Sequence, residues 1–383
     1  MEVIILCGGL GTRLRSVVSQ VPKCMAPVAG KPFLAYMLAW LGRFPVTRVI
    51  FSVGYLREVI MDYVNAREWP FRVDYAVEET PLGTGGGIRL ALSRCTEDRV
   101  LVVNGDTFFN ADLSQLVFAA PVTVALKPMQ HFDRYGAVDF DGSRITRFRE
   151  KAPCREGLIN GGIYAIDRTR LDLSSLPEKF SFEKEVLEKN AGRGWVAGQV
   201  SDSYFLDIGI PDDYARAQRE LPELEAVLKA SDAAVASSAT TLFLDRDGVI
   251  NRHIEGDYVR CWEQWEWMPG ILESLALWAR KFPRIVLVTN QRGVGRGLMS
   301  DADLADIHAR MRARILEAGG RIDLILVCTE VEENHPRRKP NVGMFQEACA
   351  LFPEITPRES ITIGDADSDA AFAANCGMSF IRV

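Results

Sequence analysis

The sequence predicts an α/β protein with two domains, for three reasons. The chain has 383 residues, more than one hydrophobic core usually supports. Short apolar runs alternate with amphipathic segments of helical length, which is the pattern of βαβ units and parallel sheets. Acidic residues follow apolar runs in both halves of the chain, so we expect a separate site in each half.

The expected strands are short runs rich in Val, Ile and Leu. They span Val3–Leu6, Arg48–Val53, Arg99–Asn104, Val122–Leu126, Thr241–Leu244, Arg284–Thr289, Leu324–Val327 and Ser360–Ile363. Between the fourth and fifth runs, a stretch of small and hydroxyl residues follows a predicted helix that reaches Lys229. We therefore expect a first domain at residues 1–225, a linker at 226–240 and a second domain at 241–383.

Composition and charge narrow the functional classes. The formal net charge is −6, from 51 acidic and 45 basic residues that are interspersed, so we expect small-molecule substrates and no nucleic-acid partner. The 8 cysteines lack metal-ligand or disulfide spacing, which indicates buried thiols in a reducing compartment. The first residues resemble neither a signal peptide nor a membrane span, so we expect a cytoplasmic protein without a membrane partner. The oligomeric state is left open.

A glycine-rich turn follows the first expected strand. It contains Gly8, Gly9, Gly11, Thr12 and Arg13. Backbone N–H groups at such a turn can approach phosphate oxygens, and the Arg13 guanidinium adds charge-assisted contacts. An ordinary tight turn between a strand and a helix is the alternative interpretation. A second basic residue, Lys23, follows nearby and favours a phosphate clamp.

A carboxylate lies just beyond another expected strand of the first half. Asp106 follows the run that ends at Asn104, and the carboxyl ends of parallel strands are where open α/β sheets bind ligands. Asp106 could instead cap a following helix. Its occurrence together with the glycine-rich turn favours a metal ligand.

The second half begins with a pair of carboxylates. Asp245 and Asp247 come directly after an apolar strand and are one residue apart. One carboxylate in such a pair can attack phosphorus, and the other can exchange protons with the leaving group. Carboxylates at this place can also hold a divalent cation. The pair therefore predicts phosphoryl-transfer chemistry.

Three further residues complete this set in chain order. Thr289 ends an expected strand and offers a hydroxyl, Lys339 offers an ammonium, and Asp365 follows the last run. Each alone has an ordinary explanation, such as a strand-end cap or a surface charge. The ordered occurrence of all of them favours one catalytic site.

An ordered set of motifs covers roughly residues 1–220. The motifs are Gly8–Leu14, Pro22-Lys23, Leu82–Gly86, Asn104–Asp106, Glu150-Lys151, Asn160–Tyr164 and Asp207–Gly209. This half resembles the sugar-1-phosphate nucleotidylyltransferases. The resemblance implies a Rossmann-like nucleotidyltransferase domain with a mixed sheet, in which a sugar 1-phosphate oxygen attacks the α-phosphorus of a nucleoside triphosphate and pyrophosphate leaves.

The resemblance also implies roles for single residues. The implied nucleotide-binding residues are Gly8, Gly9, Gly11, Thr12, Arg13, Lys23, Gly83, Thr84, Gly85 and Asp106. Arg13 and Lys23 would also assist catalysis, and Asp106 would hold Mg²⁺ with Asp207. The residues implied to bind the sugar phosphate are Lys151, Gly161, Gly162 and Glu183. A solvated surface charge is the alternative for the lysines and for Glu183.

Further motifs narrow this resemblance. These motifs are most similar to those of guanylyltransferases that act on D-glycero-α-D-manno-heptose 1-phosphate, and mannose-1-phosphate guanylyltransferases come second. The motifs are Met25–Val28, Gly30–Leu34 and Ser181–Lys184. The implied nucleotide is therefore GTP. Nothing in the residue chemistry of the sequence separates guanine from another base.

The second half, roughly residues 240–383, resembles the haloacid-dehalogenase superfamily of phosphatases, which implies a Rossmannoid parallel sheet. The resemblance implies Asp245 as the nucleophile that forms an aspartyl-phosphate, and Asp247 as general acid and base. Thr289 and Lys339 would bind the phosphoryl group. Asp365 would complete a Mg²⁺ site with Asp245 and the backbone carbonyl of Asp247.

Within that superfamily, the motifs are closest to histidinol-phosphate and heptose-bisphosphate phosphatases. The residues implied to bind the sugar phosphate are Asn290, Gln291, Arg296 and Arg338. The usual zinc loop of these relatives is reduced here to Cys328 and His335. Two ligands cannot close a four-coordinate site, so we expect no zinc.

Both halves point to one sugar, so we expect a bifunctional enzyme. A heptose 1,7-bisphosphate would lose its 7-phosphate in the second domain, and the heptose 1-phosphate would receive GMP in the first. Three alternatives stay open: a mannose-1-phosphate guanylyltransferase fused to another sugar phosphatase, a histidinol-phosphate phosphatase, and a degenerate regulatory module in one half. The intact acid set of the second half counts against the last.

Overall fold

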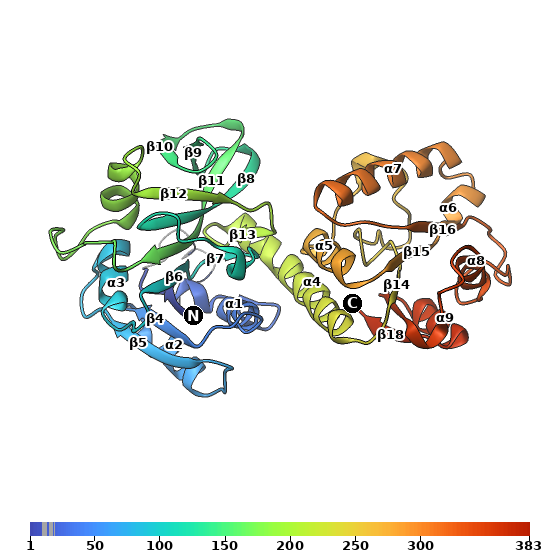
Figure 1. Ribbon diagram of the computed structural model, residues 1–383, viewed down its shortest axis with the longest axis horizontal. Helices are drawn as coiled ribbons and strands as arrows, with labels where there is room; N and C mark the ends of the chain where they lie inside the picture. The colour runs from blue at the N-terminus through green and yellow to red at the C-terminus, as the bar shows by residue number, and fades with distance from the viewer. Residues whose placement is uncertain (10–13, 15–17, 19) are drawn as a thin grey trace. The chain divides into compact units, whose positions relative to one another are not determined.

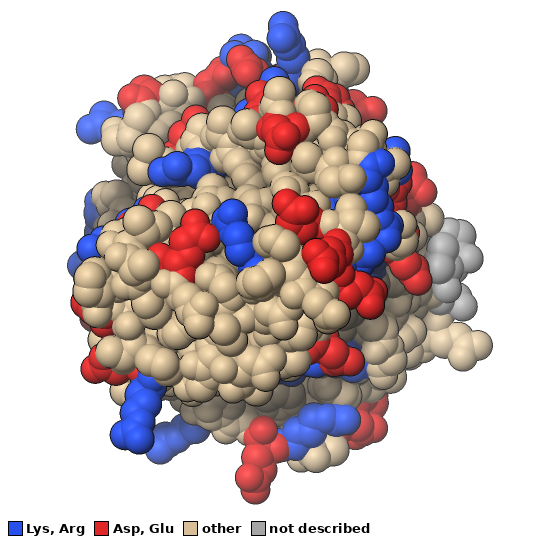
Figure 2. Space-filling view, turned by 90° about the vertical axis from the view of Figure 1, so that its right-hand side faces the viewer, with Lys and Arg blue, Asp and Glu red and all other residues tan. Residues whose placement is uncertain are grey.

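The computed structural model describes residues 1–9, 14, 18 and 20–383, so Gly11, Thr12 and Arg13 lie outside the described residues. The chain forms two compact units, Met1–Arg219 and Glu220–Val383, each built around a β-sheet with helices packed on it (Figure 1). The predicted α/β fold is confirmed in both. None of the described helices has the length and apolar character that crossing a membrane requires. On the face shown in Figure 2, basic and acidic side chains are interspersed.

The first unit is built on a mixed sheet that has nine strands within the described residues. Its central strand β1 (Glu2–Leu6) is parallel to β4 (Arg48–Val53) and β6 (Arg99–Asn104). The other strands are β5 (Arg72–Val77), β8 (Val122–Phe132), β9 (Gly136–Phe140), β10 (Ile145–Lys151), β11 (Cys154–Asp167) and β12 (Val196–Val200). β11 is antiparallel to β6, which makes the sheet mixed. β1 and β6 are almost wholly buried, which explains their continuous apolar sequences.

Helices and short turns complete the first unit. They are η2 (Lys23–Met25), α1 (Phe33–Leu41), α2 (Arg57–Asn65), α3 (Gly83–Leu92), η3 (Leu113–Gln115) and η4 (Glu183–Glu188), with the strand pair β2 (Pro27–Val28) and β3 (Lys31–Pro32). In α3, the apolar residues Ile88, Ala91 and Leu92 recur at helical spacing and join the core that includes Ile4 and Val102 of the sheet. This packing sets the start of α3 beside the carboxyl ends of the central strands.

A separate two-stranded ribbon brings two distant acidic residues together. β7 (Thr107–Phe109) is antiparallel to β13 (Phe205–Asp207), with Asp207 opposite Thr107. The backbone N–H of Ile208 also donates to the carbonyl of Asp106 at 3.1 Å. The carboxylates of Asp106 and Asp207 therefore belong to the same edge of the unit, although 100 residues of chain separate them.

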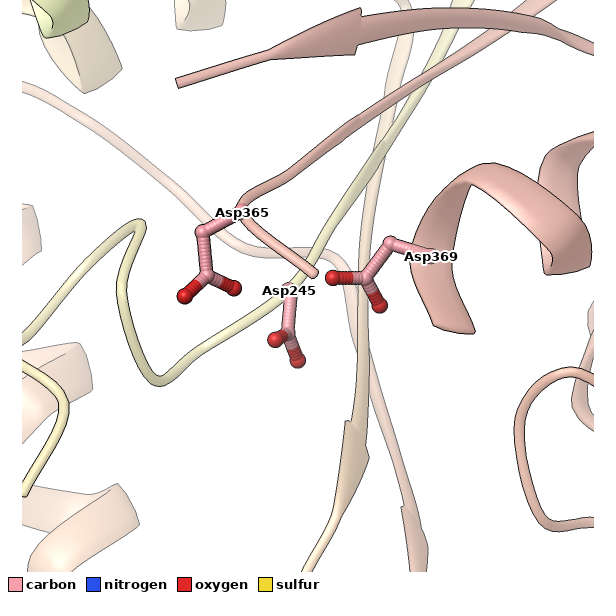
Figure 3. Close-up of side chains that lie close together, drawn as sticks. All are labelled: Asp245, Asp365 and Asp369. Atoms are coloured by element: carbon pink, nitrogen blue, oxygen red, sulfur yellow. The ribbon is translucent and has the colours of Figure 1, made fainter. Parts of the chain in front are cut away.

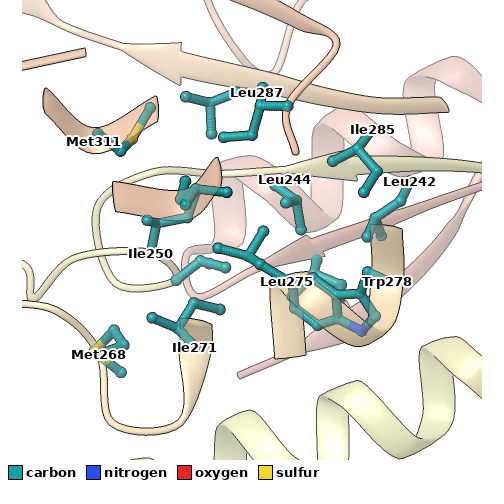
Figure 4. Close-up of a cluster of buried hydrophobic side chains, with 14 of the residues drawn as sticks. Leu242, Leu244, Ile250, Met268, Ile271, Leu275, Trp278, Ile285, Leu287 and Met311 are labelled. Atoms are coloured by element: carbon teal, nitrogen blue, oxygen red, sulfur yellow. The ribbon is translucent and has the colours of Figure 1, made fainter. Parts of the chain in front are cut away.

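The second unit contains a five-stranded sheet in the order β16-β15-β14-β17-β18, with every pair parallel. Its strands are β14 (Thr241–Leu244), β15 (Arg284–Asn290), β16 (Leu324–Cys328), β17 (Ser360–Gly364) and β18 (Ser379–Arg382). Its helices are α5 (Ile271–Lys281), α6 (Arg292–Gly295), α7 (Asp301–Glu317), α8 (Gly343–Leu351) and α9 (Asp367–Cys376), with the turns η5 (Trp262–Gln264) and η6 (Pro357–Glu359). Buried apolar clusters cover both faces of the sheet. Figure 4 shows one of them, where Leu242 and Leu244 meet Leu275 and Trp278.

The segment expected to be a linker is mostly helical. Helix α4 runs from Pro211 to Ala236, so only residues 237–240 of the expected linker 226–240 are irregular. Alanine is the strongest helix former, which favours this outcome. Val227, Ala230 and Ala234 recur at helical spacing and are buried in the core of the second unit. Burial of this stripe explains why a stretch of small residues is ordered.

We expect the second unit to need this part of α4 for its stability. A fragment that begins at Thr241 loses the buried stripe of α4 and two of the acidic partners of Arg252, Glu220 at 3.7 Å and Glu223 at 2.7 Å. Its free energy of unfolding should fall by about 3–5 kcal/mol relative to a fragment that begins at Glu220. Urea unfolding of the two fragments measures the difference. Equal stability would show that α4 contributes nothing to this core.

Candidate active sites

The first unit has a cavity of about 510 Å³ where β1, β4 and β6 end, a volume within the range of small-molecule sites. Six of the residues expected to bind the nucleotide line it: Gly8, Gly9, Lys23, Gly83, Thr84 and Asp106. The cavity is therefore the candidate nucleotide site. Gly85 is not among the lining residues; its N–H donates to the carbonyl of Phe180 at 3.0 Å, and a Cβ there would come within 2.1 Å of the Phe180 ring.

The Lys23 ammonium joins the two carboxylates expected to hold Mg²⁺. Its Nζ lies 2.5 Å from Asp106 Oδ2 and 3.8 Å from Asp207 Oδ1. Asp207 is held in place by the backbone N–H of Gly209 at 2.7 Å and by the Tyr135 hydroxyl at 3.3 Å. Both carboxylates thus face one cationic group. Two carboxylates at this spacing from a shared cation suit a hard divalent ion, so the residues present fit Mg²⁺.

A further carboxylate in this cavity is absent from the expected set. Glu78 directly follows β5, and its side chain accepts hydrogen bonds from the Ser52 hydroxyl at 2.9 Å and the Leu82 N–H at 3.0 Å. A Cβ at Gly8 would lie 2.5 Å from Glu78 Oε1, and one at Gly87 would lie 2.8 Å from it. These two glycines therefore leave room for the Glu78 carboxylate. Its position directly after a strand is the sequence signal that could have found it.

The residues expected to bind the sugar phosphate lie outside the lining of this cavity. Glu183 Oε2 accepts from the Thr84 hydroxyl at 2.6 Å and from the Ser181 hydroxyl at 2.7 Å, so Glu183 is tied to the start of α3. Gly162 has φ +75°, and a Cβ there would lie 2.7 Å from Asn104 Nδ2. Lys151 is exposed at the end of β10. Glu183 and Gly162 thus each lie against a residue that lines the cavity, Thr84 and Asn104 respectively.

Gly161, also expected to bind the sugar phosphate, is packed against a neighbouring strand. A Cβ at Gly161 would lie 2.4 Å from the Phe109 ring, so this glycine allows close packing of β11 on β7. The structure gives it a packing role instead of a direct place in the described cavity. A glycine in a strand has no side chain to reveal which of these roles it serves.

In the second unit, two adjacent parallel strands and a helix bring three carboxylates to one point (Figure 3). Asp245 follows β14 and Asp365 follows β17, which are neighbours in the sheet, and Asp369 comes from the first turn of α9. Each offers one oxygen, and these oxygens lie within 4.8 Å of one another. A Cβ at Gly248 would lie 2.1 Å from Asp365 Oδ2, so this glycine gives Asp365 its room. The carboxylate set fits a divalent cation such as Mg²⁺.

The buried ammonium of Lys339 balances part of this negative charge. Its Nζ lies 2.7 Å from Asp245 Oδ1 and 2.5 Å from Asp369 Oδ1. Burial raises the pKa of Asp245 to about 7, and Asp369 and Asp247 add to the rise while Lys339 opposes it. Burial and then Asp369 also raise the pKa of Asp365. Three carboxylates share one ammonium here, so a divalent cation would relieve their repulsion.

Asp247 has a different environment from Asp245. Burial acts to raise its pKa, but the Arg246 guanidinium and hydrogen bonds from Asn251 and Gln291 outweigh burial and lower it. Asn251 Nδ2 donates to Asp247 Oδ1 at 2.9 Å, and Gln291 Nε2 donates to Oδ2 at 2.7 Å. The pKa values of the two aspartates thus move in opposite directions.

The expected sugar-phosphate residues of this half take several positions. Gln291 is fully buried and donates to Asp247 and to the Thr289 hydroxyl at 2.8 Å, so it supports these two residues instead of facing a substrate. Asn290 exchanges two hydrogen bonds of 3.1 Å with the backbone of Lys339 and likewise positions a neighbour. Sequence periodicity assigns a side chain to a face of the sheet but does not identify its partner.

The two arginines of the expected set and the reduced zinc loop follow these residues in the sequence. Arg296 is exposed just after α6, and Arg338 donates to the Val331 carbonyl at 3.1 Å. Cys328 Sγ lies 3.8 Å from His335 Nδ1. Arg296 is thus exposed, whereas Arg338 and Asn290 are half-buried.

Comparison with known proteins identifies the first half. The family described as nucleotidyl transferase matches residues 2–223, which is more than half of the chain. The chain belongs to the nucleotidyl transferase family. It is 48% identical over 226 residues to D-glycero-alpha-D-manno-heptose 1-phosphate guanylyltransferase of Aneurinibacillus thermoaerophilus, covering 58% of this chain and 98% of the relative. The crystal structure of HddC from Yersinia pseudotuberculosis complexed with GMP-PN has a TM-score of 0.52 and 35% identity, and covers 57% of this chain and 97% of that one.

The second half of this nucleotidyl transferase family member matches a different class of enzyme. The family described as polynucleotide kinase 3 phosphatase matches residues 242–382. The chain is 45% identical over 138 residues to D-glycero-alpha-D-manno-heptose-1,7-bisphosphate 7-phosphatase of Mycobacterium tuberculosis, covering 35% of this chain and 71% of the relative. The chain is therefore a fusion of a nucleotidyltransferase and a phosphatase.

Proposed function

We propose that the chain catalyses two consecutive steps in the synthesis of GDP-D-glycero-α-D-manno-heptose. The second unit removes the 7-phosphate of heptose 1,7-bisphosphate, and the first unit transfers GMP from GTP to the resulting heptose 1-phosphate. One observation carries this proposal: the two halves separately match enzymes named for these substrates, and the product of one reaction is the substrate of the other.

The geometry of the second unit supports phosphate removal through a covalent intermediate. An Asp245 oxygen attacks phosphorus, the bond from phosphorus to the sugar oxygen breaks, and Asp247 gives a proton to that oxygen. Asp247 then takes a proton from water, whose oxygen attacks the aspartyl-phosphate and releases orthophosphate. Lys339, 2.7 Å from Asp245, and the Thr289 hydroxyl offset charge on the phosphoryl oxygens. Mg²⁺ bound at Asp245, Asp365 and the backbone carbonyl of Asp247 would add further charge neutralisation.

In the first unit, positioning and charge neutralisation are sufficient for the reaction. A phosphate oxygen of heptose 1-phosphate attacks the α-phosphorus of GTP, and the bond to pyrophosphate breaks. Lys23 neutralises charge on the nucleotide phosphates from its place beside Asp106. Mg²⁺ held by Asp106 and Asp207 would offset the charge that develops on the leaving pyrophosphate. Arg13 and the turn that contains it are proposed to bind the same phosphates.

We assign recognition of the nucleotide base to Glu78. Guanine presents two adjacent donors, N1–H and the 2-amino group, on one edge. A carboxylate is an acceptor only and can take both hydrogen bonds, whereas the corresponding edge of adenine offers an acceptor at N1. Glu78 lines the cavity, and Gly8 and Gly87 leave room there for its carboxylate. The cavity therefore contains a group that suits guanine.

We expect Glu78→Gln to weaken discrimination between GTP and inosine triphosphate, which lacks the 2-amino group. The variant should lose about 10- to 100-fold in kcat/KM with GTP, since a charge-assisted hydrogen bond is worth about 1.5–3 kcal/mol. Its loss with inosine triphosphate should be smaller. Glu79→Gln is the matched control, because Glu79 pairs with Arg57 at the surface. An unchanged ratio between the two nucleotides would exclude Glu78 as the base-reading residue.

A substrate panel tests the proposed function as a whole. The first unit should release pyrophosphate faster with heptose 1-phosphate than with mannose 1-phosphate when GTP is supplied. The second should release orthophosphate from heptose 1,7-bisphosphate faster than from histidinol phosphate. A preference for mannose 1-phosphate or for histidinol phosphate would replace the corresponding half of the proposal.

A further inference from the structure

A buried arginine lies beside Asp247 and is not used in the reaction above. The side chain of Arg246 has 0% exposure, and its Nη2 donates to Asp247 Oδ1 at 3.0 Å. Its Nε has no hydrogen-bond partner among the described residues. A buried guanidinium is stable only where acceptors meet its N–H groups. The acceptor at Nη1 therefore has a large influence on where this cation lies.

That acceptor is a histidine from a distant helix. His308 lies in α7, and its Nε2 is 3.3 Å from Arg246 Nη1. Ile307 and Met311 of the same helix are fully buried in the core, so the backbone that carries His308 is fixed. Arginine only donates hydrogen bonds, which makes Nε2 the acceptor and leaves the imidazole proton on Nδ1. Burial, followed by the charge of Arg246, lowers the pKa of His308 to about 4, which agrees with a neutral ring.

We propose that His308 is a positioning residue of the phosphatase site: it fixes the Arg246 guanidinium against Asp247 and thereby orients the Asp247 carboxylate toward the leaving oxygen. The inference rests on the phosphatase reaction proposed above. Asp247 Oδ1 receives hydrogen bonds from Arg246 and Asn251, and Oδ2 receives one from Gln291. Without the His308 acceptor, Arg246 loses one of the hydrogen bonds that fix its guanidinium, and the orientation of the Asp247 carboxylate changes with it.

The chemistry of the leaving group distinguishes this role from simple support of the fold. When the phosphoryl group transfers to Asp245, the sugar oxygen is a poor leaving group. It therefore needs the proton from Asp247. A p-nitrophenolate ion leaves without protonation. A misoriented Asp247 therefore slows release from a sugar phosphate far more than release from p-nitrophenyl phosphate. Loss of correctly folded protein slows both reactions equally.

The test uses the full chain with Mg²⁺ and compares His308→Leu with His308→Gln. The leucine variant should lose about 10- to 100-fold in kcat/KM with heptose 1,7-bisphosphate and less than about threefold in kcat/KM with p-nitrophenyl phosphate. The ratio kcat/KM reports departure of the leaving group and excludes the later hydrolysis of the aspartyl-phosphate, in which Asp247 acts for both substrates. The glutamine variant can accept from Arg246 through its amide oxygen, and it should stay within about threefold of the native protein on both substrates. Arg312→Leu is the matched control, because Arg312 is exposed on the same helix.

A second measurement separates orientation from damage to the nucleophile site. Beryllofluoride binds an aspartate nucleophile as a mimic of the aspartyl-phosphate and does not need a proton donor. Its affinity should be the same in His308→Leu and in the native protein. Weakened beryllofluoride binding, an equal loss of kcat/KM on both substrates, or an unchanged kcat/KM for the sugar phosphate would overturn the proposal. Absence of phosphate release by the native protein would instead contradict the phosphatase function itself.

Discussion

Asp245→Asn should reduce orthophosphate release from heptose 1,7-bisphosphate by about 10⁴-fold or more. The amide cannot form the aspartyl-phosphate, and Lys339 loses the carboxylate 2.7 Å away. Asparagine has nearly the same size as aspartate, so the strand β14 and its buried neighbours should remain in place. Orthophosphate release under single-turnover conditions measures the effect on chemistry directly.

The matched control for this variant is Asp367→Asn in the neighbouring segment. The side chain of Asp367 is 98% exposed and pairs with Arg382 at 2.6 Å, and it is not one of the three clustered carboxylates. This change should leave phosphate release within about twofold of the native rate. Pyrophosphate release from GTP and heptose 1-phosphate should persist in both variants. Substantial phosphate release by Asp245→Asn would exclude Asp245 as the nucleophile.

Asp106→Asn should reduce guanylyl transfer by about 10²- to 10³-fold. The change removes a negative charge that lies 2.5 Å from the Lys23 ammonium and faces the same cation as Asp207. A neutral amide is a weaker Mg²⁺ ligand than a carboxylate, so the variant should also need more Mg²⁺ for half-maximal activity. Pyrophosphate release measured across a Mg²⁺ titration reports both effects.

Asp112→Asn serves as the control for this change. Asp112 caps the turn η3 through its contact with the Ser114 N–H at 3.0 Å, and its side chain has no contact with the Lys23 and Asp106 pair among the described interactions. The control should transfer GMP at a rate close to that of the native protein. Near-normal transfer by Asp106→Asn, with an unchanged Mg²⁺ requirement, would remove Asp106 from the metal site.

The strands and the phosphatase acids could be predicted because their signals are local. A strand buried on both faces is a continuous apolar run, as in β14 and in the Ile285–Val288 part of β15. Parallel pairing then brings the residues after β14 and β17 to one edge, which is how Asp245 and Asp365 meet. Neither inference depends on knowing a distant contact in advance.

Other features depend on tertiary contacts that the sequence does not display. The alanine-rich part of α4 resembles a linker by composition, and its burial beside Val227 is what makes it helical. Glu78 follows β5, whose residues are only partly buried and give a weak strand signal. The contact of Arg246 with His308 joins residues 62 positions apart. Sequence periodicity carries no information about such pairs.

The most direct test of a two-step enzyme incubates the full chain with heptose 1,7-bisphosphate, GTP and Mg²⁺ and follows orthophosphate and pyrophosphate separately. Orthophosphate should appear first, pyrophosphate should follow after a lag, and one of each should form for every GDP-heptose. With Asp245→Asn, the bisphosphate should give neither product, and added heptose 1-phosphate should restore pyrophosphate alone. Pyrophosphate released from the bisphosphate without prior loss of orthophosphate would contradict the proposed order of the two reactions.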